Sequence, residues 1–492
     1  MLGLKGYERT IALGIIHYLM LWSLFVRLRS ILQNPNNNGN DLSLKGMWIF
    51  SLMYLPLGLM HGPAAGILAS IYVSHFGLSL ATVGFVTLIV RLFDAVTDPM
   101  IGYFSDRLET RWGGRKPFVL GGMVIVCLAI YFVYFPGENP SAAFFLSWFA
   151  LLYLGWTIME IPSLAWAVEI TSSGPGRIRI FMFRSMMTSS GTALLFAIPF
   201  LPIFLSSEIT PETLRWVGWI GLVLLPLFTI VALIFVKQGQ NFAVQEQSQL
   251  LPFLKSASRN GPFLIYLAVA LLWGIGTGMY FALAFLFFTQ ILGYVQGFAV
   301  IGLLSLVVAV PAYYFWVKVS DWIGPRRMCA IANFCVPLFL LPIAFIPPGK
   351  EYFPLTLTLI CLAQSSASGW FVGGKTLLAD AADFDLLKTG VNRAGKYFSF
   401  ETFVNKASNG LAGGIAFAMV GLIGYDAAIG AANTDQVITG FRAVMVAPPV
   451  VLTFLSGLII LWFPITRRRH AIMRKRIEMR AARAKAEPAT AA

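Results

Sequence analysis

Charged residues are scarce in this sequence. Asp, Glu, Lys and Arg supply 12% of its 492 residues, whereas soluble domains contain about 25%. Hydrophobic residues supply 58% and the mean hydropathy is +0.75. Apolar stretches of about 20 residues, the length that a helix needs to cross hydrocarbon, recur along the whole chain. A soluble globular protein is therefore excluded, and the sequence predicts an all-α membrane protein.

Cysteines and hydrolytic motifs are also few. The four cysteines, Cys127, Cys329, Cys335 and Cys361, lie inside apolar stretches with neither metal-ligand spacing nor a paired framework. We interpret them as free thiols. The sequence has no HExxH or GxSxG motif, which argues against a membrane enzyme.

One nucleotide-binding motif is complete but lies in the wrong context. Gly369 to Thr376 fit the phosphate-binding pattern GxxxxGK[ST]. That loop works only between a strand and a helix, where its backbone amides are free to hold phosphates. Here the motif lies inside an apolar span, so we reject a nucleotide site and predict no cofactor. An ion gradient is then the available energy source.

Twelve spans are predicted from Met47 onward. They cover residues 48–74, 81–105, 117–136, 142–168, 180–204, 214–236, 261–291, 294–318, 327–347, 353–379, 397–422 and 440–466. The loops after even-numbered spans are basic, whereas the loops after odd-numbered spans carry most of the acids. By the positive-inside rule, both ends of the twelve-span body lie in the cytoplasm, and we expect a multi-pass protein of a bacterial inner membrane.

The two ends of the chain lie outside this plan. Residues 11–26 form a short apolar stretch that fits an interfacial helix, a thirteenth span or translated upstream sequence. The basic tail fits anionic lipid headgroups better than nucleic acid. The predicted organisation is an extension over 1–46, a six-helix half over 47–236, a cytoplasmic linker over 237–260, a second half over 261–466 and the tail over 467–492.

A charged loop motif occurs twice, six spans apart. Gly102, Asp106 and Arg107 resemble Asp321, Gly324 and Arg326. This spacing predicts a duplicated six-helix unit, with the solute site between the halves. The loop charges either form a gate between the halves or only fix the topology. The candidate gating residues are Asp106, Arg107, Arg115, Arg177, Arg179, Asp321 and Arg326.

Three segments carry a family resemblance. Span two contains Arg91-Leu-Phe-Asp94-Ala-Val-Thr97-Asp98-Pro99, span four contains Thr157-Ile-Met-Glu160-Ile-Pro162, and a third segment runs from Ala379 to Lys406. They resemble the major facilitator superfamily, and within it the glycoside-pentoside-hexuronide cation symporters, typified by melibiose permease. The resemblance covers most of the chain from Met47 to Pro464. It implies a fold of twelve helices in two six-helix halves.

Asp94 and Asp98 are the candidate cation site. Spaced four residues apart, their carboxylates project from one helix face about 6 Å apart, and charges in hydrocarbon are costly unless they face a polar interior. Oxygen ligands suit a small hard cation, and Thr97 and Thr157 complete the candidate set. The resemblance implies sodium, but Thr97 stands where the family has Asn, which leaves sodium or proton open. In the alternative interpretation, Arg91 only neutralises Asp94.

Glu160 and Arg184 are the main substrate candidates. Glu160 lies in mid-span beside Pro162, where a broken hydrogen-bond ladder exposes backbone groups. The resemblance implies that an acid and an arginine here hold sugar hydroxyls; a plain buried ion pair is the alternative. From the second half, the candidates are Glu401, Thr402, Asn405 and Lys406. Lys406 matches a family lysine, whereas Glu401 replaces a glutamine.

One acid that the resemblance implies is missing. Gly58 stands where the family has a sugar-binding aspartate in span one, and Leu164 stands where it has a tryptophan. His61, one turn beyond Gly58, is a further candidate for proton coupling or substrate binding, although a lone histidine is as often a packing residue.

We therefore predict a secondary transporter that couples sodium or proton to the symport of a sugar or glycoside. A cation-coupled carrier of a lysophospholipid or another amphiphile is the alternative, and a membrane receptor or enzyme that moves nothing is the weakest hypothesis. The expected partners are a small-molecule substrate and membrane lipid, with neither nucleic acid nor an obligate protein partner.

Overall fold

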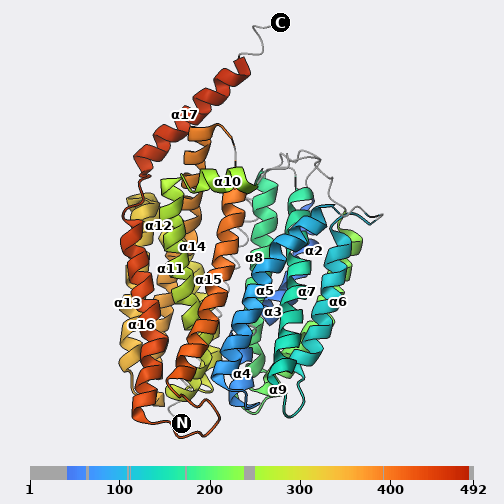
Figure 1. Cartoon of the computed structure of the whole chain (residues 1–492), viewed down its shortest axis with the longest axis vertical. Coiled ribbons are helices and arrows are strands. Elements are labelled where there is room, and N and C mark those ends of the chain that lie inside the picture. Colours follow the sequence, from blue (N-terminus) through green and yellow to red (C-terminus); the bar gives the residue numbers. More distant parts are fainter. Residues whose placement is uncertain are drawn as a thin grey trace.

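A computed structural model describes residues 42–62, 66–107, 110, 112–171, 174–237, 250–391 and 393–486. These residues form helices and connecting turns, which agrees with the predicted all-α class (Figure 1). The predicted N-terminal extension lies mostly outside the described residues.

The first half begins with three short helices. Its helices are α2 (Leu44–Leu52), α3 (Tyr54–Gly62), α4 (Leu68–Ser74), α5 (Leu80–Arg107), α6 (Lys116–Tyr134), α7 (Ala142–Glu169), α8 (Gly174–Ala197) and α9 (Pro211–Phe235). After the linker come α10 (Leu250–Ala257), α11 (Gly261–Leu286), α12 (Gly297–Ile323), α13 (Pro325–Leu340), α14 (Phe353–Thr389), α15 (Ala394–Leu422), α16 (Asp435–Ile460) and α17 (Arg467–Ala486).

Nine helices among the described residues are long and apolar enough to cross a membrane. They correspond to nine of the twelve predicted spans. The other three predicted spans are α2 to α4, which is interrupted, and the more polar helices α8 and α15. Polar helices in a membrane bundle avoid lipid by facing other helices or a water-filled cavity. The two polar helices, α8 and α15, are therefore expected to contribute to a solute path.

The break between α2 and α3 has a local cause. Pro56 lies at the third position of α3. It lacks the amide hydrogen that would bond the carbonyl of Leu52, and its ring crowds that carbonyl. The chain therefore turns at Met53 before α3 begins.

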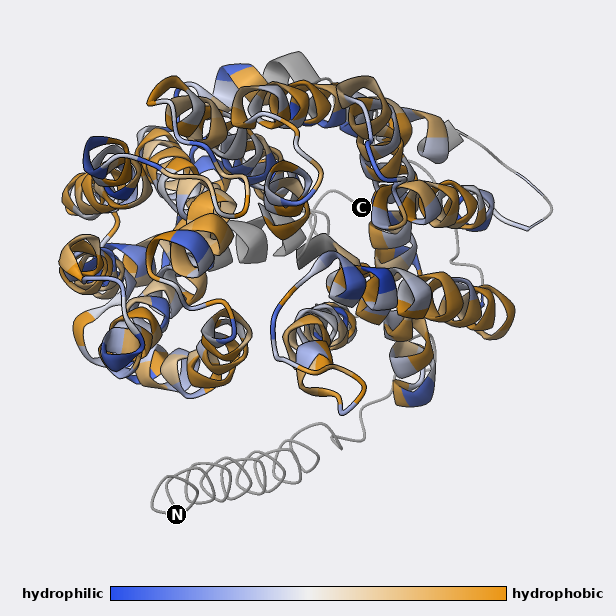
Figure 2. Ribbon diagram, turned by 90° about the horizontal axis from the view of Figure 1, so that it is seen from below, coloured by the Kyte–Doolittle hydropathy of each residue, from blue (hydrophilic) through white to orange (hydrophobic). Residues whose placement is uncertain are grey.

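The two halves use the same helix pairs. In the first half α3 packs on α8 and α9, α6 packs on α7 and α9, and α5 packs on α7. Six spans later α11 packs on α15 and α16, α13 packs on α14 and α16, and α12 packs on α14. Viewed along the helices, the chain shows two bundles side by side (Figure 2). The residue boundaries predicted for the halves stay predictions.

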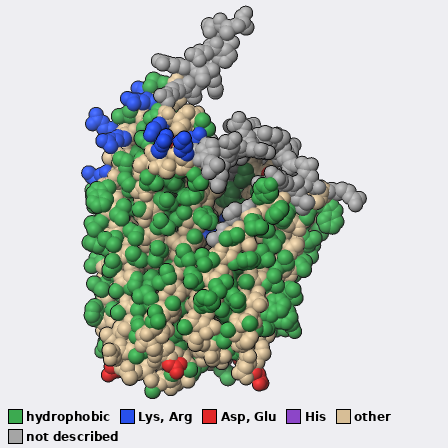
Figure 3. Space-filling model, in the orientation of Figure 1, with side chains coloured by type: hydrophobic (Ala, Val, Ile, Leu, Met, Phe, Trp, Pro, Cys, Tyr) green, Lys and Arg blue, Asp and Glu red, His purple; other side chains and the backbone are tan. Residues whose placement is uncertain are grey.

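The two ends of the bundle differ in charge. One end, here called the basic end, carries α10, α17 and the turns before α6, α13 and α15. The opposite, acidic end carries Glu138, Glu208, Glu351 and Asp426. Figure 3 shows Lys and Arg side chains at the first end and Asp and Glu side chains at the other.

The halves meet closely toward the acidic end. A Cβ on Gly84 of α5 would lie 3.0 Å from the backbone nitrogen of Ala418, and one on Gly414 of α15 would lie 3.1 Å from the Gly84 carbonyl oxygen. Nearer that end, α4 meets α11 and α8 meets α12. Figure 3 shows a hollow between the halves at the basic end. The described conformation is therefore closed at the acidic end and open at the basic end.

The basic end is extended by one long helix. α14 has 37 residues, which is about 55 Å at the rise of an α-helix, whereas the hydrocarbon core is about 30 Å thick. Its far end holds α10 through Asp385, which accepts a hydrogen bond from Ser256 at 2.6 Å. It holds α17 through Asp380 and Asp383, each 3.4 Å from His470. Thus α14 anchors both α10 and α17.

Candidate functional site

Helices α5 and α7 bring the predicted cation-site residues together. The Thr157 hydroxyl lies 2.7 Å from Oδ1 of Asp94 and 3.0 Å from Oδ1 of Asp98. Thr157 is fully buried, and Asp94 is 7% exposed. The predicted spacing therefore does place both carboxylates on one face, turned toward α7.

This arrangement has more acceptors than donors. A threonine hydroxyl has one hydrogen to donate, yet two carboxylate oxygens lie within hydrogen-bonding distance of it. Two neighbouring carboxylates repel each other unless a proton or a cation lies between them. Thr97 does not supply a second donor here, because its hydroxyl bonds the Asp94 carbonyl at 3.2 Å. A positive charge beside the pair therefore stabilises it.

Lys406 joins this pair to the substrate candidates. Its ammonium lies 3.2 Å from Oδ2 of Asp98 and 3.4 Å from Oε2 of Glu160. Lys406 belongs to α15 of the second half, whereas both acids belong to the first. One cation from the second half therefore contacts both predicted sites at once.

Glu160 forms the predicted pair with Arg184. The Arg184 guanidinium donates to Oε1 of Glu160, and the Trp156 indole donates to Oε2 at 2.9 Å. The same guanidinium lies over the ring of Tyr54, 4.7 Å from its centroid. Helix α7 runs through Pro162 without a break in its helical assignment. Glu160 is thus held by groups from α7, α8 and α15.

Arg91 donates its hydrogen bond to a tyrosine, and it also interacts electrostatically with Asp94. Among the described side chains, its guanidinium donates to the Tyr153 hydroxyl at 2.6 Å and lies over that ring, 4.2 Å from the centroid. Its role is therefore to join α5 to α7, beside the carboxylates. In direct contact within the network, three carboxylates (Asp94, Asp98 and Glu160) face two cations (Arg184 and Lys406).

Glu401 lies apart from this network. Its carboxylate is 3% exposed and forms an ion pair with Lys375 of α14, whose side chain is 54% exposed. The GxxxxGK[ST] match containing Lys375 lies inside α14. The pairing of these two residues is not predicted by the sequence, in which they lie 26 residues apart on two helices.

The remaining substrate candidates divide by exposure. The Thr402 side chain is exposed, with its hydroxyl bonded to the Phe398 carbonyl at 3.0 Å. Asn405 is half-buried, and its amide oxygen accepts a hydrogen bond from Asn409 at 2.6 Å. His61 lies at the end of α3, but its side chain is outside the described part of the structure.

The candidate gating residues contact their own half in this conformation. Arg115 pairs with Glu169 at 2.8 Å, and Arg326 donates to the Phe463 carbonyl at 3.1 Å. Asp321 is exposed, and its backbone carbonyl accepts from Arg467. Arg179 is half-buried on α8. The side chains of Asp106, Arg107 and Arg177 lie outside the described residues, and the gate stays a prediction.

The structure explains the glycine in span one. A Cβ on Gly58 would overlap the carbonyl oxygen of Thr188, and one on Gly191 would overlap the Leu55 carbonyl. Helices α3 and α8 therefore touch backbone to backbone here. An acid at position 58 would force them apart, so this chain cannot use that position to hold a solute.

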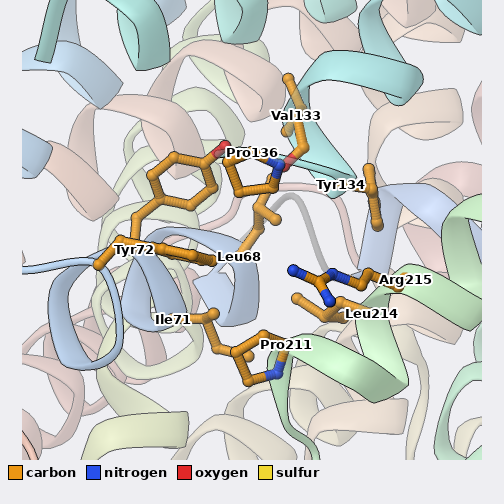
Figure 4. A pocket seen from close by; sticks show the side chains of 10 residues that line it. Leu68, Ile71, Tyr72, Val133, Tyr134, Pro136, Pro211, Leu214 and Arg215 are labelled. Atoms are coloured by element: carbon orange, nitrogen blue, oxygen red, sulfur yellow. Dashed lines mark hydrogen bonds between the residues drawn. The ribbon is translucent and has the colours of Figure 1, made fainter. Parts of the chain in front are cut away.

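A small pocket lies elsewhere, at the acidic end of the first half (Figure 4). Apolar and aromatic side chains line it, among them Leu68, Tyr72 and Pro211, with Arg215 at its edge. It has no contact with the charged network. A polar solute would find only one charged partner there.

No group of three or more His, Cys, Asp or Glu side chains that could hold a metal ion occurs in the described part of the chain. The Asp94 and Asp98 pair uses a different donor set, namely two carboxylates and hydroxyls. Such hard oxygen donors fit a small cation that is carried rather than a resident transition metal.

A family model and individual relatives of this chain all describe sugar transporters or carriers. A family model described as MFS/sugar transport protein matches residues 49–467. The chain is 23% identical to the isoprimeverose transporter of Lactiplantibacillus pentosus over 418 residues, which cover 80% of this chain and 83% of that protein. It is 25% identical to the glucuronide carrier protein homolog of Escherichia coli (strain K12) over 423 residues, which cover 82% and 88%.

Solved structures share the fold. A D-xylose-proton symporter superimposes with a TM-score of 0.63 at 13% identity, covering 85% of this chain and 97% of that one. The nucleoside transporter NupG gives 0.61 at 14% identity, covering 85% and 99%. These likenesses confirm the predicted fold class.

Proposed function

This chain belongs to the MFS/sugar transport protein family, and we propose that it couples a sodium ion or a proton to the symport of a sugar or glycoside by alternating access. Its family and relatives are membrane transporters and not enzymes. The predicted resemblance is thereby confirmed.

The observation that carries this proposal is the network around Lys406. Asp94 and Asp98 form a carboxylate pair suited to a cation. Glu160 and Arg184 form a pair suited to hydroxyl groups. The Lys406 side chain contacts Asp98 of the first pair and Glu160 of the second. A cation that binds Asp98 competes with the Lys406 ammonium. Its binding therefore changes what holds Glu160, and by linkage each ligand alters the affinity for the other by the same factor.

The polar groups at Glu160 favour a sugar as the carried solute. A carboxylate accepts and a guanidinium donates in fixed directions, which suits a ring bearing several hydroxyls. Trp156 adds an aromatic surface beside them. Relatives named for isoprimeverose, glucuronide and lactose point the same way. A lysophospholipid remains the alternative cargo, to be tested beside the sugars.

The basic end is proposed to face the cytoplasm. Basic loops stay on the cytoplasmic side during membrane insertion. Both ends of the twelve-span body lie at the basic end of the bundle. In that orientation, the described conformation is open to the inside. Transport then requires the halves to separate at the acidic end and close at the basic end.

Binding should be tested before transport. The purified protein would be heated with isoprimeverose, lactose, a glucuronide or a lysophospholipid, in sodium, in lithium and at two pH values. A sugar that raises the unfolding temperature only with its coupling cation supports symport. Stabilisation by the lysophospholipid, with all sugars silent, would replace the cargo.

Transport is then measured in proteoliposomes with the stabilising solute. A cation gradient should drive accumulation by the wild type but not by Asp98→Asn, whereas Glu351→Gln, a change on an exposed loop, should behave as the wild type. Accumulation against the solute's gradient by Asp98→Asn would contradict the proposal.

A further inference from the structure

A second buried acid in this chain has its own cation and its own surroundings. Glu401 is 3% exposed on α15, and the Lys375 ammonium of α14 neutralises it. The Tyr266 phenol of α11 also interacts with this carboxylate, and Cys329 of α13 lies next to Tyr266. Lys406, five residues further along α15, is engaged with Asp98 and Glu160 instead. The pair is thus a separate charge centre in the second half.

The two partners differ in their access to water. The Lys375 side chain is 54% exposed, whereas that of Glu401 is 4% exposed. Lys375 and Phe371 are exposed on the face of α14 opposite Gly369 and Gly373, which pack against α12 and α13. That face is covered nearer the acidic end, where Ser368 is 2% exposed. Lys375 therefore faces the hollow that opens at the basic end.

This difference in exposure allows Lys375 to leave Glu401 and return to it. A lysine ammonium is a compact, strongly hydrated charge on a flexible four-carbon stem, so Lys375 can turn into water without any helix moving. Glu401 cannot follow it. A buried carboxylate that loses its cation becomes neutral by taking up a proton, because an isolated charge in a low dielectric is too costly.

We propose that Glu401 and Lys375 form a proton-exchange site in the second half, distinct from the Asp94 and Asp98 pair and filled from the basic end. In one state the Glu401 carboxylate is ionised and paired with Lys375. In the other state Lys375 is hydrated in the hollow, and the Glu401 oxygen holds a proton taken from water at the basic end. No bond other than this O–H bond forms or breaks.

The site can influence the Lys406 network through its charge. Glu401 and Lys406 are five residues apart on α15, which is about 7.5 Å along the helix axis. Protonation of Glu401 removes a negative charge from that helix and leaves Lys406 more strongly attracted to Asp98 and Glu160. The inference rests on the proposed function only in that the protein is an ion-coupled transporter.

Infrared difference spectroscopy can test the site without a solute. The full-length protein in lipid would be compared between alkaline and acidic buffer, with the C=O band of protonated carboxyl groups as the readout. Glu401→Gln, which keeps the shape but removes the ionisable group, should lose the contribution of one carboxyl group in apolar surroundings. Lys375→Gln should increase that contribution, because the buried acid has lost its cation. Glu351→Gln, at an exposed site, should lose only a water-exposed carboxyl signal.

A transport measurement separates this inference from the general proposal. With a pH dye inside proteoliposomes, Glu401→Gln should differ from the wild type by one proton per solute, because the proton taken up at the basic end is released when the halves open at the acidic end. The variant should keep its dependence on Asp98. If Asp98→Asn retains cation-driven accumulation, the proposed function fails. If Asp98→Asn loses it but Glu401→Gln leaves both the carboxyl band and the proton count unchanged, the proton-exchange site is refuted.

Discussion

Glu160 is the residue through which substrate recognition should be most directly altered. Glu160→Gln keeps the shape but removes the charge that accepts from Arg184 and Trp156. A hydrogen bond to a charged group is worth about 1.5 to 3 kcal/mol, so the apparent affinity for the sugar should fall about tenfold or more. Trp156→Phe, which removes one donor to Glu160, should have a smaller effect in the same direction. Counterflow at varied solute concentration measures both.

The cation affinity provides the control for these two variants. Because Asp94 and Asp98 are untouched and only their competition with Lys406 changes, the stabilisation by the coupling cation alone should fall less than the sugar affinity. A loss of cation stabilisation equal to the loss of sugar affinity would mean that Glu160 supports the fold and not the sugar.

Lys406 lends itself to a double-variant test. Lys406→Met leaves Asp98 and Glu160 without the ammonium that lies 3.2 Å and 3.4 Å away. Removing one partner of a buried pair is strongly destabilising, whereas replacing both charges is much less so. We therefore expect Lys406→Met to lower the unfolding temperature and Lys406→Met with Asp98→Asn to recover part of it. If the double variant is as unstable as the sum of the two singles, the contact with Asp98 has no energetic weight.

The residues of the first-half site could be predicted because their signals lie close in sequence. Asp94 and Asp98 share a helix face because they lie four residues apart. Trp156 and Glu160 have the same spacing, so the hydrogen bond between the indole and the carboxylate could also have been predicted. The pairing of Lys375 with Glu401 could not be read in this way. It joins two helices, and its partner depends on how α14 is rotated against α15.

At the scale of helices, the contact between α5 and α15 is the feature most sensitive to added volume. A Cβ on Gly84 would meet the α15 backbone at 3.0 Å. Gly84→Val should hold the two helices apart and prevent closure at the acidic end, so uptake should be lost although the protein inserts. Gly121→Val on α6 is the matched control, because a Cβ there meets nothing within 4 Å. Uptake by Gly84→Val at the control rate would argue against this close contact.

Helix length and hydropathy identify most of the predicted spans, but not the first span, α8 or α15. Nine predicted spans meet the length and hydropathy expected of a membrane helix. The first span is interrupted because Pro56 and the α3 to α8 contact at Gly58 impose local constraints that hydropathy does not register. α8 and α15 are less apolar because they carry Arg184, Glu401 and Lys406, which are the candidate site residues themselves.

At the scale of the whole molecule, the halves must separate at the acidic end during each cycle. Cβ atoms at Ala81 and Gly421 would lie 3.5 Å apart, within the range of about 3.5 to 4.5 Å that a disulfide requires. Ala81→Cys with Gly421→Cys should form a cross-link under oxidation that abolishes uptake, and reductant should restore it. Each single cysteine variant should transport with or without oxidant.

The cross-linked protein also tests the direction of opening. Since the basic end stays open, a solute added from that side should still bind and raise the unfolding temperature. Full uptake by the oxidised pair would show that the acidic end does not need to open and would overturn alternating access for this chain.

The polarity of α15 bears on how the protein is made. On the scale of translocon-mediated insertion, each charged residue near a helix centre costs about 2.5 to 3.5 kcal/mol, and α15 carries both Glu401 and Lys406. A nascent α15 should therefore enter the bilayer poorly by itself and wait beside α14, where Lys375 neutralises Glu401, and α5, where Asp98 receives Lys406. The charges that serve transport thus oblige this helix to be assembled only after α5 and α14, which supply its partners.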